Sequence, residues 1–180
     1  MAKGARKKDG LSLTRRLALM AVLTAIALGI FMLEAQLPAP VPIPGVKLGL
    51  ANIITLVTML LLGRKEALAV LAMRLFLGAV FAGNFSTLIY SASGGILAYL
   101  VMGLCTRWIP ENRLWVTSAL AALGHNAGQL AAYLAVTKTP GILVYYGPIL
   151  AVSGVITGVF TGVAAMYLLR SLRKIDLWRH

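Results

Sequence analysis

Acidic residues, histidine and cysteine are all scarce in this sequence of 180 residues. It contains five Asp and Glu, two His and one cysteine, Cys105. A single cysteine excludes an internal disulfide, and no Cys/His cluster has the spacing of a metal site. No Walker A sequence occurs either, so energy for any transport would have to come from another chain or from an ion gradient. We therefore expect no cofactor and no redox or zinc chemistry.

Long polar stretches are also lacking. Hydrophobic residues make up 59% of the chain, charged residues make up 12%, and the mean hydropathy is +0.86. Soluble domains are only about half apolar. Successive apolar runs of about 17 to 23 residues, each long enough to cross a bilayer as a helix, fill nearly the whole length. The sequence therefore predicts an all-α integral membrane protein, a bundle of six transmembrane helices without a separate soluble domain.

The apolar runs divide the chain into a basic tail at 1–16, a transmembrane domain at 17–169 and a second basic tail at 170–180. The start resembles a signal peptide, but its apolar run is long and no A-x-A cleavage site follows, so we expect an uncleaved span. The connector 142–147 is predicted to form a short interfacial helix. The predicted spans are 17–35, 46–63, 66–83, 86–104, 114–136 and 148–169.

The net charge of +12 would suggest a nucleic-acid partner in a soluble protein, but here the positions of the charges indicate a membrane topology. Fourteen of the seventeen Lys and Arg lie in the two tails and in the loops after the second and fourth predicted spans. Lys47 and Lys138 lie on the opposite side, and Arg74 lies within the third span. The positive-inside rule then places both termini in the cytoplasm. We expect no nucleic-acid partner.

Proline occupies every second position from 38 to 44, between the first two predicted spans. Proline fixes φ and removes a backbone donor, so 37–47 is predicted to be a stiff, extended loop on the outer side. Glu34, Gln36, Lys47 and Asn52 surround this loop and suggest that it covers a polar site. The alternative is a plain hairpin connection between two spans.

Several polar residues fall inside the predicted spans or at their outer ends, where polar groups are costly and rarely face lipid. Arg74 lies roughly 12 Å along its span, near the membrane midplane. His125, Gln129 and Tyr133 recur every fourth residue and so share one helix face. We predict an outward-opening cavity for an anionic or hydrogen-bonding small molecule, because Arg offers a permanently charged fork of donors. The predicted ligand-binding residues are Glu34, Asn52, Arg74, Asn84, Ser91, His125, Asn126, Gln129 and Tyr133. In the alternative interpretation, Arg74 pairs with Glu34, and His125 and the amides tie helices together.

Small residues recur at four-residue spacing in two spans. Gly154, Gly158 and Gly162 form a double GxxxG stripe, which usually serves close helix packing. Ala21, Ala25 and Gly29 form a similar stripe in the first span, which could pack inside the bundle or against a partner.

Two motifs carry a resemblance to a known family: residues 37–52, which read LPAPVPIPGVKLGLAN, and residues 124–129, which read GHNAGQ. With the six-span hydropathy, they resemble the Gx transporter family, which is also described as heptaprenyl diphosphate synthase component I. That family is similar to the substrate-binding S components of energy-coupling factor (ECF) transporters. The resemblance implies a multi-pass protein of the bacterial cell membrane that sits in lipid and binds a vitamin-like small molecule on its outer side. It also implies that the 21–25–29 stripe docks on a transmembrane coupling protein driven by ATPases.

The enzyme name attached to the family leads to a different expectation. Prenyl diphosphate synthases hold Mg²⁺ and a diphosphate with clustered aspartates. This chain has two aspartates, Asp9 and Asp176, one in each tail, and no DDxxD-like cluster. It is therefore not expected to be a synthase by itself, although it could be a non-catalytic membrane subunit that assists heptaprenyl diphosphate synthesis. A proton-coupled secondary transporter, with Glu34 and His125 relaying protons, is a further alternative. A purely structural scaffold would leave Arg74 without a task.

Overall fold

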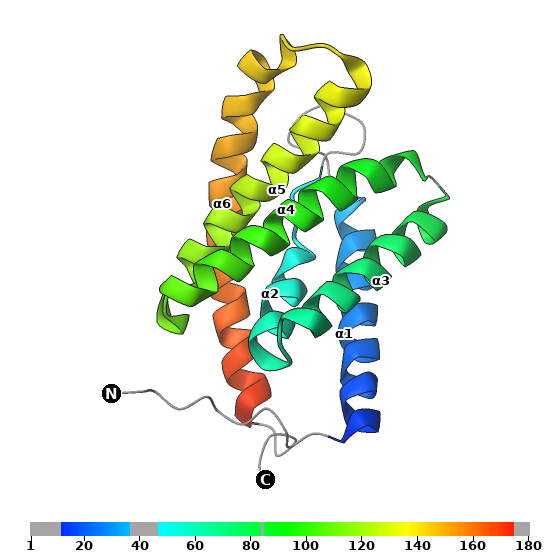
Figure 1. Ribbon diagram of the computed structural model, residues 1–180. Coiled ribbons are helices and arrows are strands. Elements are labelled where there is room, and N and C mark those ends of the chain that lie inside the picture. Colours follow the sequence, from blue (N-terminus) through cyan, green and yellow to red (C-terminus); the bar gives the residue numbers. More distant parts are fainter. Residues whose placement is uncertain (1–11, 37–46, 84, 175–180) are drawn as a thin grey trace.

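The computed structural model describes residues 12–36, 47–83 and 85–174, and these residues form helices and connecting turns without a strand (Figure 1). The all-α prediction is therefore confirmed for this part of the chain. The helices are α1 (Leu13–Glu34), α2 (Asn52–Leu61), α3 (Arg64–Ala82), α4 (Ser86–Trp108), the 3-10 turn η1 (Glu111–Arg113), α5 (Leu114–Thr137) and α6 (Ile142–Lys174).

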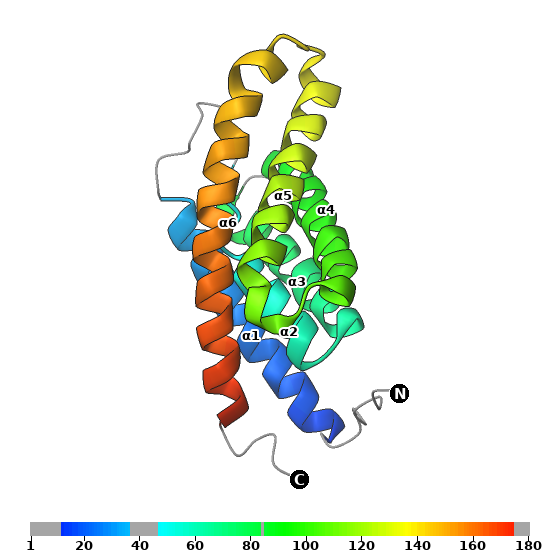
Figure 2. The same ribbon diagram turned by 90° about the vertical axis from the view of Figure 1, so that its left-hand side faces the viewer.

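The helices pack around α2, which contacts α1, α3, α4 and α6. Seven of the ten α2 residues are buried, so this short helix forms the middle of the bundle. On one side α5 packs between α4 and α6, and on the other α3 joins α1 to α4 (Figures 1 and 2). The start of α1 and the end of α6 lie at the same end of the bundle (Figure 1). That arrangement agrees with an even number of crossings.

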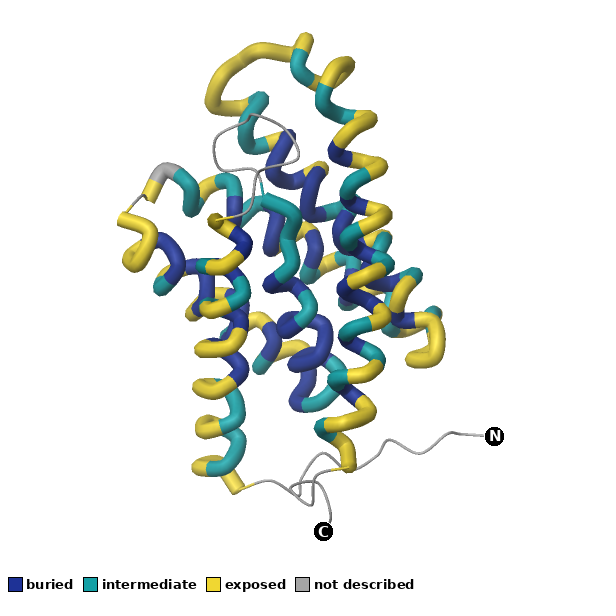
Figure 3. Tube along the Cα trace, turned by 180° about the vertical axis from the view of Figure 1, so that it is seen from behind, coloured by how far each residue is buried: buried dark blue, intermediate teal, exposed yellow. Residues whose placement is uncertain are grey.

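Three helices, α1, α4 and α6, are long and apolar enough to cross a membrane. The outer surface is apolar as well: Phe76, Phe81 and Phe160 each expose 60% or more of their surface. Figure 3 shows the exposed residues of α1 and α6 on the outer side of each helix and the buried ones facing the bundle. Large exposed aromatic side chains over such a surface indicate a lipid-facing protein. The chain is a multi-pass membrane protein.

The second predicted span is too long. Helix α2 begins at Asn52 rather than near residue 46, and 47–51 is not helical. Gly49 has φ +79°, a left-handed conformation that interrupts any helix reaching it from Lys47. Ten helical residues rise about 15 Å, roughly half of a bilayer's hydrocarbon core. Residues 47–50 are half-buried and Ala51 is buried, so the bundle shields much of this polar backbone from lipid.

The last span shows a second difference from the prediction. Residues 142–147 do not form a separate interfacial helix but are the first turns of α6, which runs on through Pro148 to Lys174. Pro148 offers no N–H to the carbonyl of Val144, so one hydrogen bond of the helix is missing there. The 33 residues of α6 would span about 50 Å, well beyond the roughly 30 Å of a hydrocarbon core.

The glycine stripe of α6 packs closely against α5, as predicted. A Cβ added at Gly158 would lie 2.5 Å from the Cα of Ala119, and one at Gly162 would lie 2.4 Å from the Cα of Trp115. Real Cβ atoms do not approach so closely, so the two backbones touch at glycine. Next to this seam, Leu56, Met102 and Leu114 belong to the largest apolar core.

Candidate functional site

Four buried polar side chains and one lysine gather where the end of α1, the segment 47–51, α3 and α5 meet. We call this cluster the polar centre. Glu34, Arg74, His125 and Gln129 each expose 5% or less of their surface, and Lys47 is half-buried. The sequence analysis placed Arg74 near the membrane midplane and the other four from there toward the outer side, and the structure brings all five together.

Glu34 holds the segment 47–51 against the bundle. As the last residue of α1, it turns its carboxylate toward the chain that enters α2. Its Oε1 accepts a hydrogen bond from the N–H of Gly49 at 2.5 Å, and its Oε2 accepts one from Leu50 at 3.0 Å. Hydrogen bonds to an ionised carboxylate are among the stronger ones in proteins. Glu34 therefore satisfies two backbone donors that no helix satisfies.

Gln129 holds the same segment from the opposite side. With its amide nitrogen toward Lys47, it donates to the Lys47 carbonyl at 3.1 Å. Its amide oxygen then accepts from the Lys47 N–H and from Nε2 of His125, both at 3.1 Å. In this orientation the amide nitrogen faces an acceptor and the amide oxygen faces two donors. The hydrogen-bond network therefore shows which amide position is nitrogen and which is oxygen. Gln129 thus couples the conformation of Lys47 to that of the imidazole.

Two glycines make room for the imidazole of His125. A Cβ at Gly49 would lie 2.9 Å from its Cδ2, and a Cβ at Gly94, on α4, would lie 2.8 Å from its Nδ1. The ring is therefore clasped between a loop and a helix backbone. Neither Gly49 nor Gly94 was predicted from the sequence to belong to the site. One signal was available, because Gly94 is followed by Gly95 within a helix, where each glycine costs about 1 kcal/mol relative to alanine and so suggests a close approach.

Arg74 is buried to 97% in the middle of α3, with 3% of its surface exposed. Among the described residues, its Nε and one of its terminal nitrogens have no hydrogen-bond partner. Its guanidinium lies 5.8 Å from the ring of Phe31, and the ammonium of Lys47 lies 3.5 Å from the centroid of the same ring. Phe31, which the sequence argument also missed, therefore offers its ring to both cations.

Glu34 does not form an ion pair with Arg74. The two salt bridges among the described residues are Arg16–Glu66 and Arg173–Glu111. Arg74 and Lys47 attract the Glu34 carboxylate electrostatically, but its hydrogen bonds go to the backbone. With a neutral imidazole, two cations face one carboxylate, so the polar centre carries a net charge of about +1. The alternative interpretation, in which Arg74 and Glu34 form an ion pair that only supports the fold, is therefore not what the structure shows.

The other predicted ligand-binding residues lie around the polar centre or away from it. Asn52 is buried beside Gly49, and its Oδ1 lacks a partner within the described structure. Ser91 is buried in α4. Asn126 faces α6, where its amide donates to the Leu150 carbonyl at 2.6 Å and so ties two helices together.

Tyr133 is half-buried and packs near Tyr90, with ring centroids 6.2 Å apart. It borders the small apolar cluster of Leu130 and Leu150 rather than the polar centre. Asn84 lies outside the described residues. Within 12–36, 47–83 and 85–174, no three His, Cys, Asp or Glu residues are grouped as a metal site would require.

The small residues of the α1 stripe face outward. Ala21, Ala25 and Gly29 are all exposed, and a Cβ added at Gly29 would meet no atom within 4 Å. Internal packing, one of the two roles left open by the sequence, is therefore not what the structure shows for this stripe.

A scan against protein families matches residues 23–168 to the family described as heptaprenyl diphosphate synthase component I. The match covers most of the chain. This chain belongs to the heptaprenyl diphosphate synthase component I family. The resemblance carried by the proline-rich and GHNAGQ motifs is thereby confirmed. The matched residues 23–168 of this chain include every residue of the polar centre. Neither the curated proteins nor the solved structures gave a match.

Proposed function

We propose that this protein is a membrane-embedded substrate-binding subunit, similar to the S components of ECF transporters, that binds a small anion at the polar centre. The single observation that carries the proposal is the burial of Arg74, which forms no ion pair with a described residue and whose Nε and one terminal nitrogen find no hydrogen-bond partner there. The ligand class is a small vitamin-like or isoprenoid-related molecule with an acidic group.

The energetics of Arg74 favour a ligand over a purely structural role. A charged side chain near the bilayer centre costs at least about 2.5 kcal/mol on insertion scales. An anion bound at the polar centre would offset part of that cost. It supplies a negative charge to a cluster with a net charge of about +1, and it accepts hydrogen bonds from the free donors of Arg74. The planar fork of Arg suits a carboxylate or a phosphate.

Ligand entry requires the segment 47–51 to move, because Gly49 lies against His125 and Lys47 is bound to Gln129. Hydrogen bonds on both sides of the segment, two of them to the Glu34 carboxylate, oppose this movement. The hydrogen bonds from Gly49 and Leu50 to Glu34, and those between Lys47 and Gln129, would have to open. The segment therefore serves as a latch over the site in this proposal, and the outer side of a bacterial cell membrane is the side from which it opens.

Native mass spectrometry of gently purified protein tests the proposal. We expect a small anionic molecule to co-purify with the wild type and with the exposed control Lys138→Gln, and to be lost from Arg74→Gln. Thermal unfolding after ligand removal should give similar transition temperatures for all three, while ligand should stabilise only the first two. Full retention of the molecule by Arg74→Gln would refute the proposal. The proposal would also be refuted if the transition temperature of Arg74→Gln were lower than that of the wild type by the same amount with and without ligand. Arg74 would then have a structural role.

The family match favours a second candidate, a non-catalytic membrane subunit that assists prenyl diphosphate synthesis. A diphosphate is an anion, so the same positive centre would suit it. The sequence has no aspartate cluster, so the chemistry would have to come from a partner chain. Adding a prenyl diphosphate to ligand-free protein separates the candidates: binding that depends on Arg74 supports the assisting subunit. Absence of such binding, with a polar acid as the co-purified molecule, supports the uptake subunit.

In this proposal, ATP hydrolysis by ATPases bound to a transmembrane coupling protein supplies the energy, and the chain itself has no Walker A sequence. The outward-facing stripe of Ala21, Ala25 and Gly29 is the proposed contact with that protein. Both termini are proposed to be cytoplasmic, which leaves the latch on the outside.

A further inference from the structure

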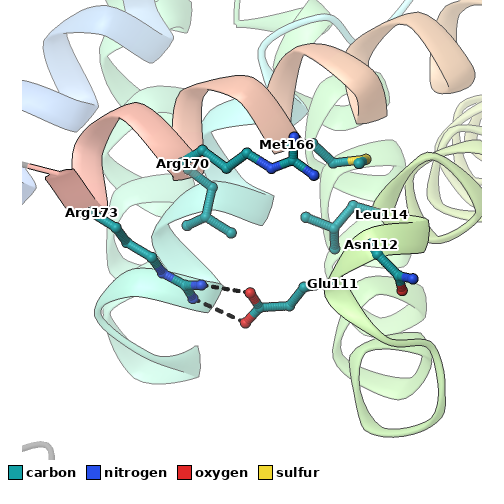
Figure 4. A pocket seen from close by; sticks show the side chains of 7 residues that line it. Glu111, Asn112, Leu114, Met166, Arg170 and Arg173 are labelled. Carbon is teal, nitrogen blue, oxygen red and sulfur yellow. Dashed lines mark hydrogen bonds and ion pairs between the residues drawn. The ribbon is translucent and has the colours of Figure 1, made fainter.

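Away from the polar centre, a cavity lies at the end of the bundle where α6 ends and α5 begins (Figure 4). Its volume is about 250 Å³, several times the roughly 30 Å³ that one water occupies in the liquid. None of its residues belongs to the polar centre. The lining residues are Glu111, Asn112, Leu114, Met166, Leu169, Arg170 and Arg173.

The charges in this cavity do not cancel. Nη1 and Nη2 of Arg173 donate to the two carboxylate oxygens of Glu111 at 2.6 Å and 2.9 Å, and Figure 4 shows this pair across the cavity. The hydrogen bond to Glu111 raises the pKa of Arg173, so that guanidinium stays charged. Arg170 forms no salt bridge with any described residue. Two guanidinium groups against one carboxylate leave the lining with a charge of about +1, and a phosphodiester carries a single negative charge.

The opposite wall of the cavity is apolar. Leu114 and Leu169 expose 1% and 3% of their surface, and Met166 is half-buried. Phe160 and Tyr167, which also belong to α6, are largely exposed on the outer surface of the bundle. A charged rim beside an apolar wall at the end of lipid-facing helices suits an amphiphile rather than a fully water-soluble anion.

We propose that this cavity binds the phosphodiester headgroup of an anionic phospholipid, with Arg170 as its charge partner. The phosphate accepts hydrogen bonds from the Arg170 guanidinium, and the adjoining glycerol and first methylenes lie along Leu114 and Leu169. Basic pockets between helices on the cytoplasmic side of a membrane are known to take such headgroups. This site is independent of the polar centre, so it stands or falls separately from the proposed function.

The experiment uses the full chain in nanodiscs of phosphatidylcholine, with or without phosphatidylglycerol, and follows thermal unfolding. The variants are Arg170→Gln, Glu111→Gln and the matched control Arg107→Gln, an exposed arginine that does not line the cavity. We expect phosphatidylglycerol to raise the transition temperature of the wild type and of the control. Arg170→Gln should lose most of that rise while keeping the wild-type value in phosphatidylcholine. Glu111→Gln leaves Arg173 without its counter-charge, so its rise should be at least as large as that of the wild type.

A third arm adds inorganic phosphate to the phosphatidylcholine discs. If phosphate alone reproduces the rise that depends on Arg170, and phosphatidylglycerol adds nothing, the lipid is not the ligand and the proposal fails. Equal transition temperatures in the two lipids, a full rise in Arg170→Gln, or a smaller rise in Glu111→Gln would each overturn it too. If Arg170→Gln is less stable even in phosphatidylcholine, native mass spectrometry of the folded fraction decides: loss of bound phosphatidylglycerol supports the proposal, and retention refutes it.

Discussion

The α4–α5–α6 side of the bundle and the α1–α3 side are held together in different ways. Between α4 and α5 a Cβ at Gly128 would lie 2.5 Å from the carbonyl oxygen of Ser93, and between α5 and α6 the contacts at Gly158 and Gly162 are equally close. On the other side, the ring of Phe31 fills the space beside Gly78, and Glu34 holds a stretch of loop. Backbones in direct contact leave little freedom to shift, whereas side-chain contacts can be exchanged.

This difference assigns separate tasks to the two sides. The α4–α5–α6 side supplies His125 and Gln129 from a fixed wall, and its glycines set the distance between the helices. The α1–α3 side supplies Glu34 and Arg74, together with the segment 47–51, which moves in the proposed function when a ligand enters. The mutations below are ways to break one side without the other, in order of decreasing effect on the free energy of unfolding.

The largest loss of stability is expected for Glu34→Ala. This change leaves the N–H groups of Gly49 and Leu50 without their acceptor and leaves Arg74 and Lys47 without a nearby negative charge. Removing one member of a buried charged group typically costs about 3–5 kcal/mol. Glu111→Ala is the matched control, because its pair with Arg173 is half-exposed and such pairs contribute about 0–1 kcal/mol. Denaturant unfolding in detergent measures both, and equal losses would contradict the role given to Glu34.

A moderate loss is expected for Gly158→Ala on the fixed side. The added methyl would need space that the Ala119 backbone occupies, and overpacking of this kind costs about 1–3 kcal/mol. Gly103→Ala, also within a helix, meets no atom within 4 Å and should instead be neutral or stabilising by up to about 1 kcal/mol. The same unfolding measurement compares the two variants. If Gly158→Ala were as stable as Gly103→Ala, the α5–α6 contact would be looser than the structure shows.

Much of this arrangement could be predicted from the sequence, because it depends on periodic patterns. Apolar runs located the long helices, and four-residue spacing placed His125 and Gln129 on one face. The same geometry could have excluded Asn126: neighbours on a helix are about 100° apart, so it points to α6 instead. Hydropathy had no means to find the start of α2, because the helix is interrupted by the backbone conformation of Gly49 and not by a polar residue.

Some features could not be predicted because they depend on contacts between distant segments. Phe31 lies beside Arg74 and Lys47 although none of the three is near another in the sequence. The cavity between η1 and α6 similarly joins Glu111 to Arg173, 62 positions apart. Continuation of α6 through Pro148 was missed for a local reason: proline usually marks a boundary, and here the helix continues without one hydrogen bond.

Almost no loss of stability is expected for Ala25→Leu, which tests the movable side from its outer surface. Ala25 is exposed on α1, so a larger apolar side chain there faces lipid and displaces nothing inside the bundle. If the stripe docks on a coupling protein, the added volume should abolish co-purification with that partner and leave ligand occupancy unchanged. The exposed Val22→Leu, next to it on α1 but outside the stripe, is the control. An unfolded Ala25→Leu monomer, or co-purification equal to that of the control, would contradict docking.

The smallest effect on stability is expected for a variant that reports which end of the bundle faces outward. Lys138 ends α5 in a left-handed conformation and is exposed at the tip that lies opposite the start of α1 and the end of α6 (Figure 1). Replacing the sole cysteine by Cys105→Ser and adding Lys138→Cys gives a chain with a single thiol at that tip. If the basic ends are cytoplasmic, a membrane-impermeant maleimide should label intact cells, as the excess of Lys and Arg at those ends predicts. The companion Arg107→Cys, also in the Cys105→Ser background, should be labelled only after lysis. Labelling in the reverse order would place the latch of the polar centre inside the cell and the Arg170 cavity outside, and so would exchange the sides proposed for the small anion and the phospholipid.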